Sequence, residues 1–201
     1  MKKMFLSLFL VTALTSGAFA QSEEKKISFG VKAEVNSNFY LVSDSDIISS
    51  TSNAFGGNVG LFFLTNLTNN LAIQVELLGQ YRNAEFTILD KEQTLTNWNI
   101  EVPAYIMGQF PMGSGRFFFG AGPYGVAGIS ATMGGADMYA DNNGMFTFSR
   151  WNLGVGMIVG IELGCGLQLN VNYKYGMFNS NISENGNFVE NTATVGLGYR
   201  F

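Results

Sequence analysis

In most segments of this sequence, every second residue is uncharged and largely apolar, and the charged residues occupy only the positions in between. Because successive side chains of a β-strand point to opposite faces, each alternating segment predicts a strand with two unlike faces. One face of every predicted strand is uncharged and largely apolar, and the other is charged in seven of the eight strands. The predicted strands are residues 27–36, 55–65, 71–82, 97–106, 116–124, 151–162, 167–176 and 192–201. The charged residues of the second face are Lys32, Glu34, Glu76, Arg82, Glu101, Arg116, Glu162, Lys174, Glu190 and Arg200.

Strands of this kind fit a closed barrel that keeps its charges inside and its apolar face in lipid. Segments of about 10 residues with alternating hydrophobicity are typical of outer-membrane barrels. A soluble ligand-carrying barrel is a distant alternative, because it requires an apolar interior and a polar exterior. The sequence therefore predicts an all-β fold, an eight-stranded antiparallel up-and-down transmembrane β-barrel.

The predicted connections alternate between short and long. Residues 67–70, 111–115 and 164–166 form short connections rich in Asn, Gly or Pro. The long connections are residues 37–54, 83–95, 130–149 and 178–187. Outer-membrane barrels have short periplasmic turns and longer extracellular loops, so the short connections are expected in the periplasm.

The first 20 residues have the features of a secretory signal. Lys2 and Lys3 give a positive start, residues 4–14 are largely apolar, and Ala18-Phe19-Ala20 matches a cleavage site. A retained anchor helix is the alternative, but a membrane span needs about 20 apolar residues. We expect a cleaved signal peptide at 1–20, a short periplasmic segment at 21–26 and the barrel at 27–201, in the outer membrane of a Gram-negative cell.

Aromatic residues on the apolar face gather toward the two ends of the strands. Tyr and Trp favour the membrane–water interfaces, so two aromatic belts are expected. Near the long loops the belt residues are Tyr81, Trp98, Trp151, Tyr173 and Tyr175. Near the short turns they are Phe63, Phe110, Phe117, Phe119, Tyr199 and Phe201. The twelve steps from Trp98 to Phe110, at about 3.3 Å each and a 45° tilt, cover roughly 28 Å, which suits a membrane.

Several motifs carry a family resemblance. The sequences FFFGAGPYG (117–125), RWNLGVGMIVGIEL (150–163), NYKYGMFN (172–179) and the terminal GLGYRF resemble the eight-stranded OmpA/OmpX-like and PorT-like outer-membrane barrels. The resemblance spans residues 27–201. It implies that the terminal aromatic residue, Phe201, belongs to the signal read by the barrel-assembly machinery.

An eight-stranded barrel has an interior that side chains can fill. We expect a packed lumen in which acids and bases pair and inward glycines make room for larger side chains. The alternative is a narrow water-filled path lined by Glu76, Glu101, Arg82 and Lys174.

Composition argues against several activities. The chain has no histidine, which excludes Ser-His and Asp-His catalytic devices, and we predict no catalytic, cofactor-binding or metal site. Asp44 and Asp46 are interpreted as solvated loop residues, and residues 141–144 (DNNG) as a turn rather than a calcium loop.

Removal of Lys2 and Lys3 lowers the net charge from −4 to −6, so the basic patch of a nucleic-acid binder is not expected. The single cysteine, Cys165, cannot form an intramolecular disulfide and is expected in a turn.

Recognition is expected in the long loops, because loops on a rigid scaffold carry binding. Their acidic residues are Asp44, Asp46, Glu85, Asp90, Glu92, Asp137, Asp141 and Glu184, against Lys91. The third loop also holds the apolar residues Met133, Met138, Tyr139, Met145, Phe146 and Phe148. These six residues are either an exposed partner surface or the outer ends of strands that project from the membrane.

The function predicted from these features is a structural or surface-interaction role through acidic extracellular loops. The alternative is a small pore or an accessory component of an outer-membrane secretion or transport assembly, as the PorT-like resemblance implies. The expected partners are outer-membrane lipid and lipopolysaccharide, the barrel-assembly machinery, and an extracellular or secretion-system protein.

Overall fold

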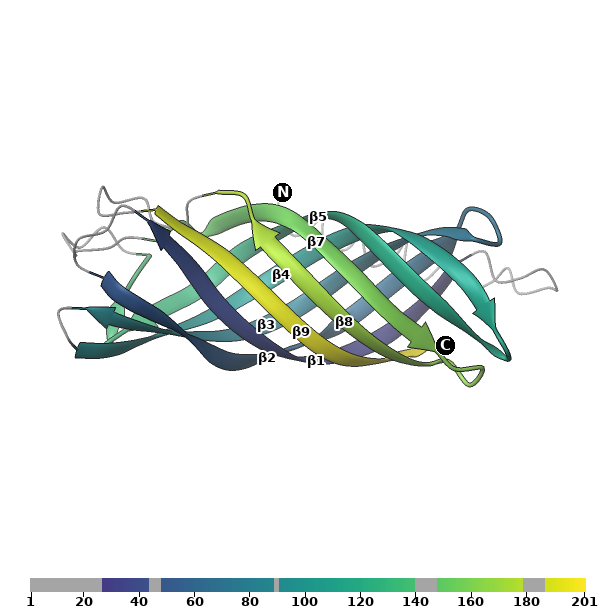
Figure 1. The fold of residues 1–201 in the computed structure, drawn as a ribbon, viewed down its shortest axis with the longest axis horizontal. Helices are drawn as coiled ribbons and strands as arrows, with labels where there is room; N and C mark the ends of the chain where they lie inside the picture. The colour runs from purple at the N-terminus through teal and green to yellow at the C-terminus, as the bar shows by residue number, and fades with distance from the viewer. Residues whose placement is uncertain (1–26, 44–47, 89–90, 140–147, 179–186) are drawn as a thin grey trace, which may run out of the picture.

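A computed structural model of the chain describes residues 27–43, 48–88, 91–139, 148–178 and 187–201, and these residues form a closed ring of antiparallel strands (Figure 1). The strands are β1 (Ile27–Ser43), β2 (Ile48–Asn66), β3 (Leu71–Ile88), β4 (Lys91–Met112), β5 (Gly115–Met133), β6 (Ala136–Asp137), β7 (Trp151–Glu162), β8 (Leu167–Gly176) and β9 (Asn187–Arg200). Their order is β4-β3-β2-β1-β9-β8-β7-β5-β6, and pairing of β4 with β5 closes the ring.

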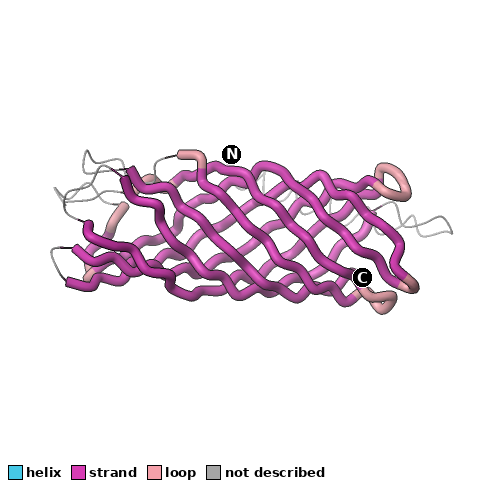
Figure 2. The backbone as a smooth tube through the Cα atoms, in the orientation of Figure 1, coloured by secondary structure: helices cyan, strands magenta, loops and turns pink. Residues whose placement is uncertain are grey.

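The wall of the barrel has eight strands, because β6 is only a two-residue return along β5. Figure 2 shows the strands winding obliquely around a common axis. The predicted eight-stranded antiparallel barrel is confirmed. Among the described residues, no helix is long and apolar enough to cross a membrane.

The three short connections lie where they were predicted. Gly113 and Gly166 have φ angles of 62° and 90°, a left-handed conformation that glycine adopts without steric cost. In the β2–β3 turn, the Thr68 hydroxyl oxygen accepts hydrogen bonds from the backbone N–H groups of Asn70 (3.3 Å) and Leu71 (3.0 Å). Local turn chemistry thus fixes this end of the barrel.

Two of the predicted long loops are mostly strand, so the predicted boundaries at 37–54 and 83–95 were wrong. β1 continues to Ser43 and β2 begins at Ile48, while β3 continues to Ile88 and β4 begins at Lys91. The inward face stays buried at Tyr40, Ala84, Phe86 and Leu95. The outward face turns polar, with Glu85 and Glu92 exposed. The strands therefore continue beyond the apolar band that identified them.

A β-bulge interrupts the β4–β5 ladder at the level of Trp98. Trp98 pairs with Ser130, but Asn99 pairs with Gly128, which leaves Ile129 as an extra residue in β5. Before the bulge the even-numbered residues of β5 point inward, and beyond it the odd-numbered residues do. As a result, Ala131 and Met133 point inward and are buried.

At the end of the barrel opposite the short turns, the wall divides between β1 and β2. The last β1–β2 pair is Asn38 with Ala54. Beyond it, β1 continues along β9 as far as the Ser43–Asn187 pair, and β2 continues along β3 to the Ile48–Ile88 pair. Figure 1 shows β1 and β9 ending together, apart from β2, β3 and β4.

Candidate functional site

The structure places all ten sequence-predicted charged residues on the inner side of the wall. Eight of them are buried, and Arg116 and Arg200 are partly exposed at the short-turn end. They form two groups that the alternation alone did not distinguish. The central network contains Lys32, Glu34, Glu76, Arg82, Glu101, Lys174 and Glu190. The second group lies at the short-turn end, is named the periplasmic group because short turns face the periplasm in outer-membrane barrels, and contains Arg116, Glu162 and Arg200.

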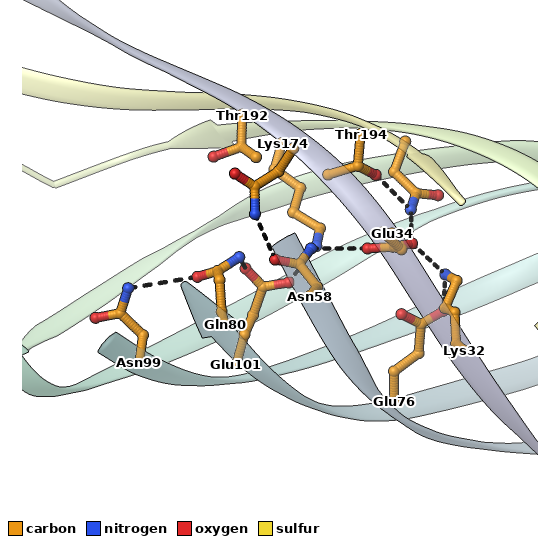
Figure 3. A network of polar contacts seen from close by, with 12 residues as sticks. Lys32, Glu34, Asn58, Glu76, Gln80, Asn99, Glu101, Lys174, Thr192 and Thr194 are labelled. Carbon is orange, nitrogen blue, oxygen red and sulfur yellow. Dashed lines mark hydrogen bonds and ion pairs between the residues drawn. The ribbon is translucent and has the colours of Figure 1, made fainter. Parts of the chain in front are cut away.

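Lys32 joins two carboxylates in the central network (Figure 3). Its Nζ lies 2.9 Å from Glu34 Oε1 and 2.8 Å from Glu76 Oε1. Amides complete the shell of Glu34, because Asn58 donates to Oε2 at 2.8 Å and Asn172 donates to Oε1 at 2.6 Å. Paired and hydrogen-bonded charges of this kind are tolerated in an interior that would reject single ones.

Glu101 is the second hub of the central network. Arg82 Nη2 donates to Glu101 Oε2 at 2.8 Å, and Lys174 Nζ contacts the other oxygen, Oε1. Gln80 adds a hydrogen bond to Oε2 at 3.0 Å. Arg82 also contacts Glu190 through Nη1, which connects β3, β4, β8 and β9 across the lumen.

Inward glycines make the space for these side chains. At Gly156, an added Cβ would lie 3.2 Å from the Tyr105 ring and 3.3 Å from Lys174 Cγ. At Gly154, it would lie 2.6 Å from the ring of Tyr124. Larger side chains from β4, β5 and β8 therefore occupy the space beside these two glycines of β7.

Among the described residues, two layers of buried apolar side chains flank the central network along the barrel axis, and the charge pattern did not predict them. The layer toward the short turns contains Leu64, Ala72, Tyr105, Met107, Phe118 and Ile158. The extracellular layer contains Tyr40, Ala84, Phe86, Leu95, Ala131, Met133, Met138, Phe148 and Phe188. Leu64 and its neighbour Phe62 did break the apolar–polar alternation of their segment, which was the available signal for an apolar layer.

Aromatic rings hold the extracellular layer together. Tyr40 packs against Phe86 with ring centroids 5.4 Å apart, and Phe188 lies 6.0 Å from Phe86 and 5.9 Å from Phe148. Burial raises the pKa of the Tyr40 hydroxyl to about 12, so this group stays neutral in the projecting part of β1. The layer fills the interior of the barrel beneath its extracellular end.

The third-loop residues Met133, Met138 and Phe148 belong to this layer and are buried. The hypothesis that they form an exposed partner surface was therefore wrong. The bulge and the short β6 return direct them into the barrel mouth. Tyr139 is partly buried beside them and stacks under Arg150, whose Cζ lies 4.6 Å from the ring centroid. Met145 and Phe146 lie outside the described residues.

The acidic residues of the predicted loops that can be placed lie on strands. Glu85 on β3, Glu92 on β4 and Asp137 on β6 are exposed, and so is Arg150. Asp44, Asp46, Asp90, Asp141 and Glu184 lie outside the described residues, as does the 141–144 segment. The exposed charge of the described extracellular end is therefore mainly negative.

The outer surface of the barrel is apolar and aromatic. Near the projecting end, Trp98, Trp151, Tyr173 and Tyr175 are exposed, and Tyr81 packs against Trp98 with ring centroids 4.9 Å apart. Near the short turns the exposed aromatic residues are Phe63, Phe110, Phe117, Phe119, Tyr199 and Phe201. Cys165 is exposed in the β7–β8 turn. The predicted signal peptide (1–20) and periplasmic segment (21–26) lie outside the described residues.

A closed ring of strands with an apolar outside and buried ion pairs defines a transmembrane β-barrel protein. The model of the family described as "Outer membrane protein beta-barrel domain" matches residues 6–201. The chain belongs to this family, and the protein is located in the outer membrane.

Solved structures agree with the fold. Outer membrane protein OprG from Pseudomonas aeruginosa is 11% identical, with a TM-score of 0.55, and the match covers 87% of this chain and 95% of OprG. Neisserial surface protein A is 16% identical, with a TM-score of 0.50, and the match covers 86% of this chain and 97% of that protein. At these identities the likeness concerns the fold alone. A search of curated protein sequences gave no match.

Proposed function

We propose that this protein is a non-catalytic surface-interaction protein whose recognition elements are its projecting extracellular strands. The observation that carries the proposal is the division of the wall between β1 and β2 beyond Asn38 and Ala54. Within the described residues, each side of the division ends in a strand that pairs with one neighbour: β1 with β9, and β2 with β3. Unpaired strand edges are templates for pairing with an extended segment of another polypeptide.

Charge favours a basic partner at this end. Glu85 and Glu92 are exposed on β3 and β4, next to the β2 edge. Exposed charges of one sign steer an oppositely charged partner during its approach. We therefore propose that the partner presents an extended segment carrying Lys or Arg.

The proposed role does not use the lumen. The apolar layer that contains Phe86 and Phe188 covers the central network from the extracellular side. The pore alternative would need a continuous polar path through this layer. An accessory role in a secretion or transport assembly is compatible with the same projecting strands and would differ only in the identity of the partner.

The remaining parts of the proposal concern biogenesis. We propose that residues 1–20 direct export and are removed, that the barrel-assembly machinery reads Phe201, and that lipid and lipopolysaccharide surround the apolar wall. Exposure of Phe201 beside Phe29, with ring centroids 5.2 Å apart, supports recognition of this aromatic end.

Photocrosslinking in intact cells tests the surface role. A photoreactive amino acid replaces Leu41 in the projecting part of β1 or Glu85 in β3, and a control variant carries it at Leu167 near a short turn. We expect a protein adduct from Leu41 and Glu85 but not from Leu167, and a weaker adduct after Glu92→Lys. The absence of an adduct at both rim positions, or the same adduct at Leu167, would contradict the proposal.

A further inference from the structure

At the short-turn end, a cavity of about 350 Å³ opens at the mouth of the barrel. It lies between the β2–β3 turn and the β4–β5 turn, at the end that faces the periplasm in outer-membrane barrels. Its polar lining comes from Asn66, Thr68, Asn69, Gln109, Arg116 and Arg200. The volume falls within the range of small-molecule binding sites.

The charges around this cavity are unequal. Arg116 Nη2 lies 2.7 Å from Glu162 Oε2, and Arg200 Nη2 lies 2.5 Å from Glu162 Oε1. Two guanidinium groups thus share one carboxylate, which leaves the periplasmic group with one positive charge in excess. Among the described residues, no ion pair joins this group to the central network, and the apolar layer that contains Phe118 and Met107 lies between the two groups on one side of the lumen.

Hydrogen-bond donors are also in excess over acceptors. Besides forming the two ion pairs, Glu162 accepts hydrogen bonds from Gln168 Nε2 at 2.7 Å and from Arg200 Nε at 2.9 Å. Arg116 donates from Nη1 to Gln109, whereas its Nε is buried without a hydrogen-bond partner. Arg200 also donates from Nη1 to the Ser28 hydroxyl at 3.2 Å. A guanidinium group has five N–H donors, so the terminal nitrogens of Arg116 and Arg200 each retain an N–H for another acceptor.

We propose that this periplasmic mouth binds a phosphate group. A phosphate oxyanion would balance the excess positive charge and accept the remaining guanidinium N–H donors, often in bidentate geometry. Two sources of phosphate can reach the site. Exposed Phe110 borders the cavity on the lipid side, which allows a phospholipid headgroup of the inner leaflet to approach. The open mouth equally admits a phosphorylated solute from the periplasm.

The test is a titration of the full mature chain, folded in a neutral detergent, with inorganic phosphate. Backbone amide chemical shifts of Thr68 and Asn69 report binding in every variant without depending on a substituted residue. We expect saturable shifts, a loss of affinity of about tenfold for Arg116→Gln or Arg200→Gln, and a gain of about tenfold for Glu162→Gln. The opposite signs separate binding from a structural role, because loss of any partner in a purely structural cluster would only disturb the mouth.

Arg150→Gln is the matched control, because it removes the same charge at the opposite end of the barrel. Its phosphate affinity should equal that of the unaltered chain. A second titration with a short-chain phosphatidylglycerol in the same detergent distinguishes the sources: a response to the lipid alone indicates a headgroup site, and a response to inorganic phosphate indicates a solute site. Either response supports the proposal. No saturable shift with either probe, or equal shifts in the Arg116→Gln and Arg150→Gln variants, would overturn it.

Discussion

Glu101 is fully buried and is the residue on which the central network most depends. Glu101→Gln would leave Lys174 without its carboxylate and Arg82 with Glu190 as its remaining acid. Removal of one partner of a buried ion pair costs about 3–5 kcal/mol, because the other charge stays buried. We expect a loss of that size in the free energy of unfolding, measured by reversible urea titration in detergent.

Glu85→Gln provides the matched control for this prediction. The substitution is chemically the same, but Glu85 is exposed on the projecting part of β3. Its unfolding free energy should stay close to that of the unaltered chain. If both variants unfolded at the same urea concentration as the unaltered chain, the network would not be the stabilising unit described above.

Phe86 is a central residue of the extracellular apolar layer, where it contacts the rings of Tyr40 and Phe188. Truncation of a buried Phe to Ala costs about 3–5 kcal/mol, since it leaves a cavity. For Phe86→Ala we expect faster hydrogen exchange at Ala84 and Leu95, with little change at Gln74 in the periplasmic half. Thr94→Ala on the exposed side of β4 is the control. Uniform acceleration along the whole barrel would show that the layer is not a separate local unit.

At the scale of elements, the sequence was sufficient for the strand count, the antiparallel ring and the two faces of each strand. It was insufficient for the strand ends. The outward face becomes acidic at Glu85 and Glu92 while pairing continues, so an apolar–polar pattern ends before the strand does. The sequence also did not predict which charged residues pair with each other, because the stagger between strands decides which inward residues meet. The bulge at Ile129 carried no signal, since the small residues around it (Ala127, Gly128, Ser130 and Ala131) do not alternate between apolar and polar.

The register of β5 beyond this bulge decides which of its side chains enter the lumen, and a change of one residue tests this. Insertion of one Ala after Ser130 would shift the rest of β5 by one residue and turn Ala131 and Met133 from the lumen to the outside. The membrane-embedded part should still fold, as judged by heat-modifiable migration on gels. The third hairpin should become sensitive to protease added to intact cells. Retention of protease resistance in the insertion variant would mean that the inward direction of Ala131 and Met133 does not set this packing.

At the scale of the molecule, the lumen is layered along the barrel axis rather than uniformly polar. From the periplasm outward it passes from the Arg116–Glu162–Arg200 group to an apolar layer, then to the central network, and finally to the layer around Phe86. Beside the first apolar layer lie the buried amides Gln168, Asn170 and Asn172 of β8, which hydrogen-bond with Glu162, with Glu34 and with one another. A hydrated ion that entered from the periplasm would have to displace these buried side chains. Ion pairs within the lumen therefore stabilise the barrel wall and do not by themselves form a channel.

This layering predicts that the purified protein does not conduct. In a planar bilayer we expect no stable, ion-selective openings, because buried side chains flank the central network on both sides and its charged groups contact one another. Trace porin is the usual source of misleading currents, and Glu101→Gln provides the control for it. Openings from a contaminant would be identical in both preparations, whereas openings through this lumen would change selectivity when the Glu101 carboxylate is removed. Stable openings with such a change in selectivity would overturn the closed-lumen interpretation and favour the pore alternative.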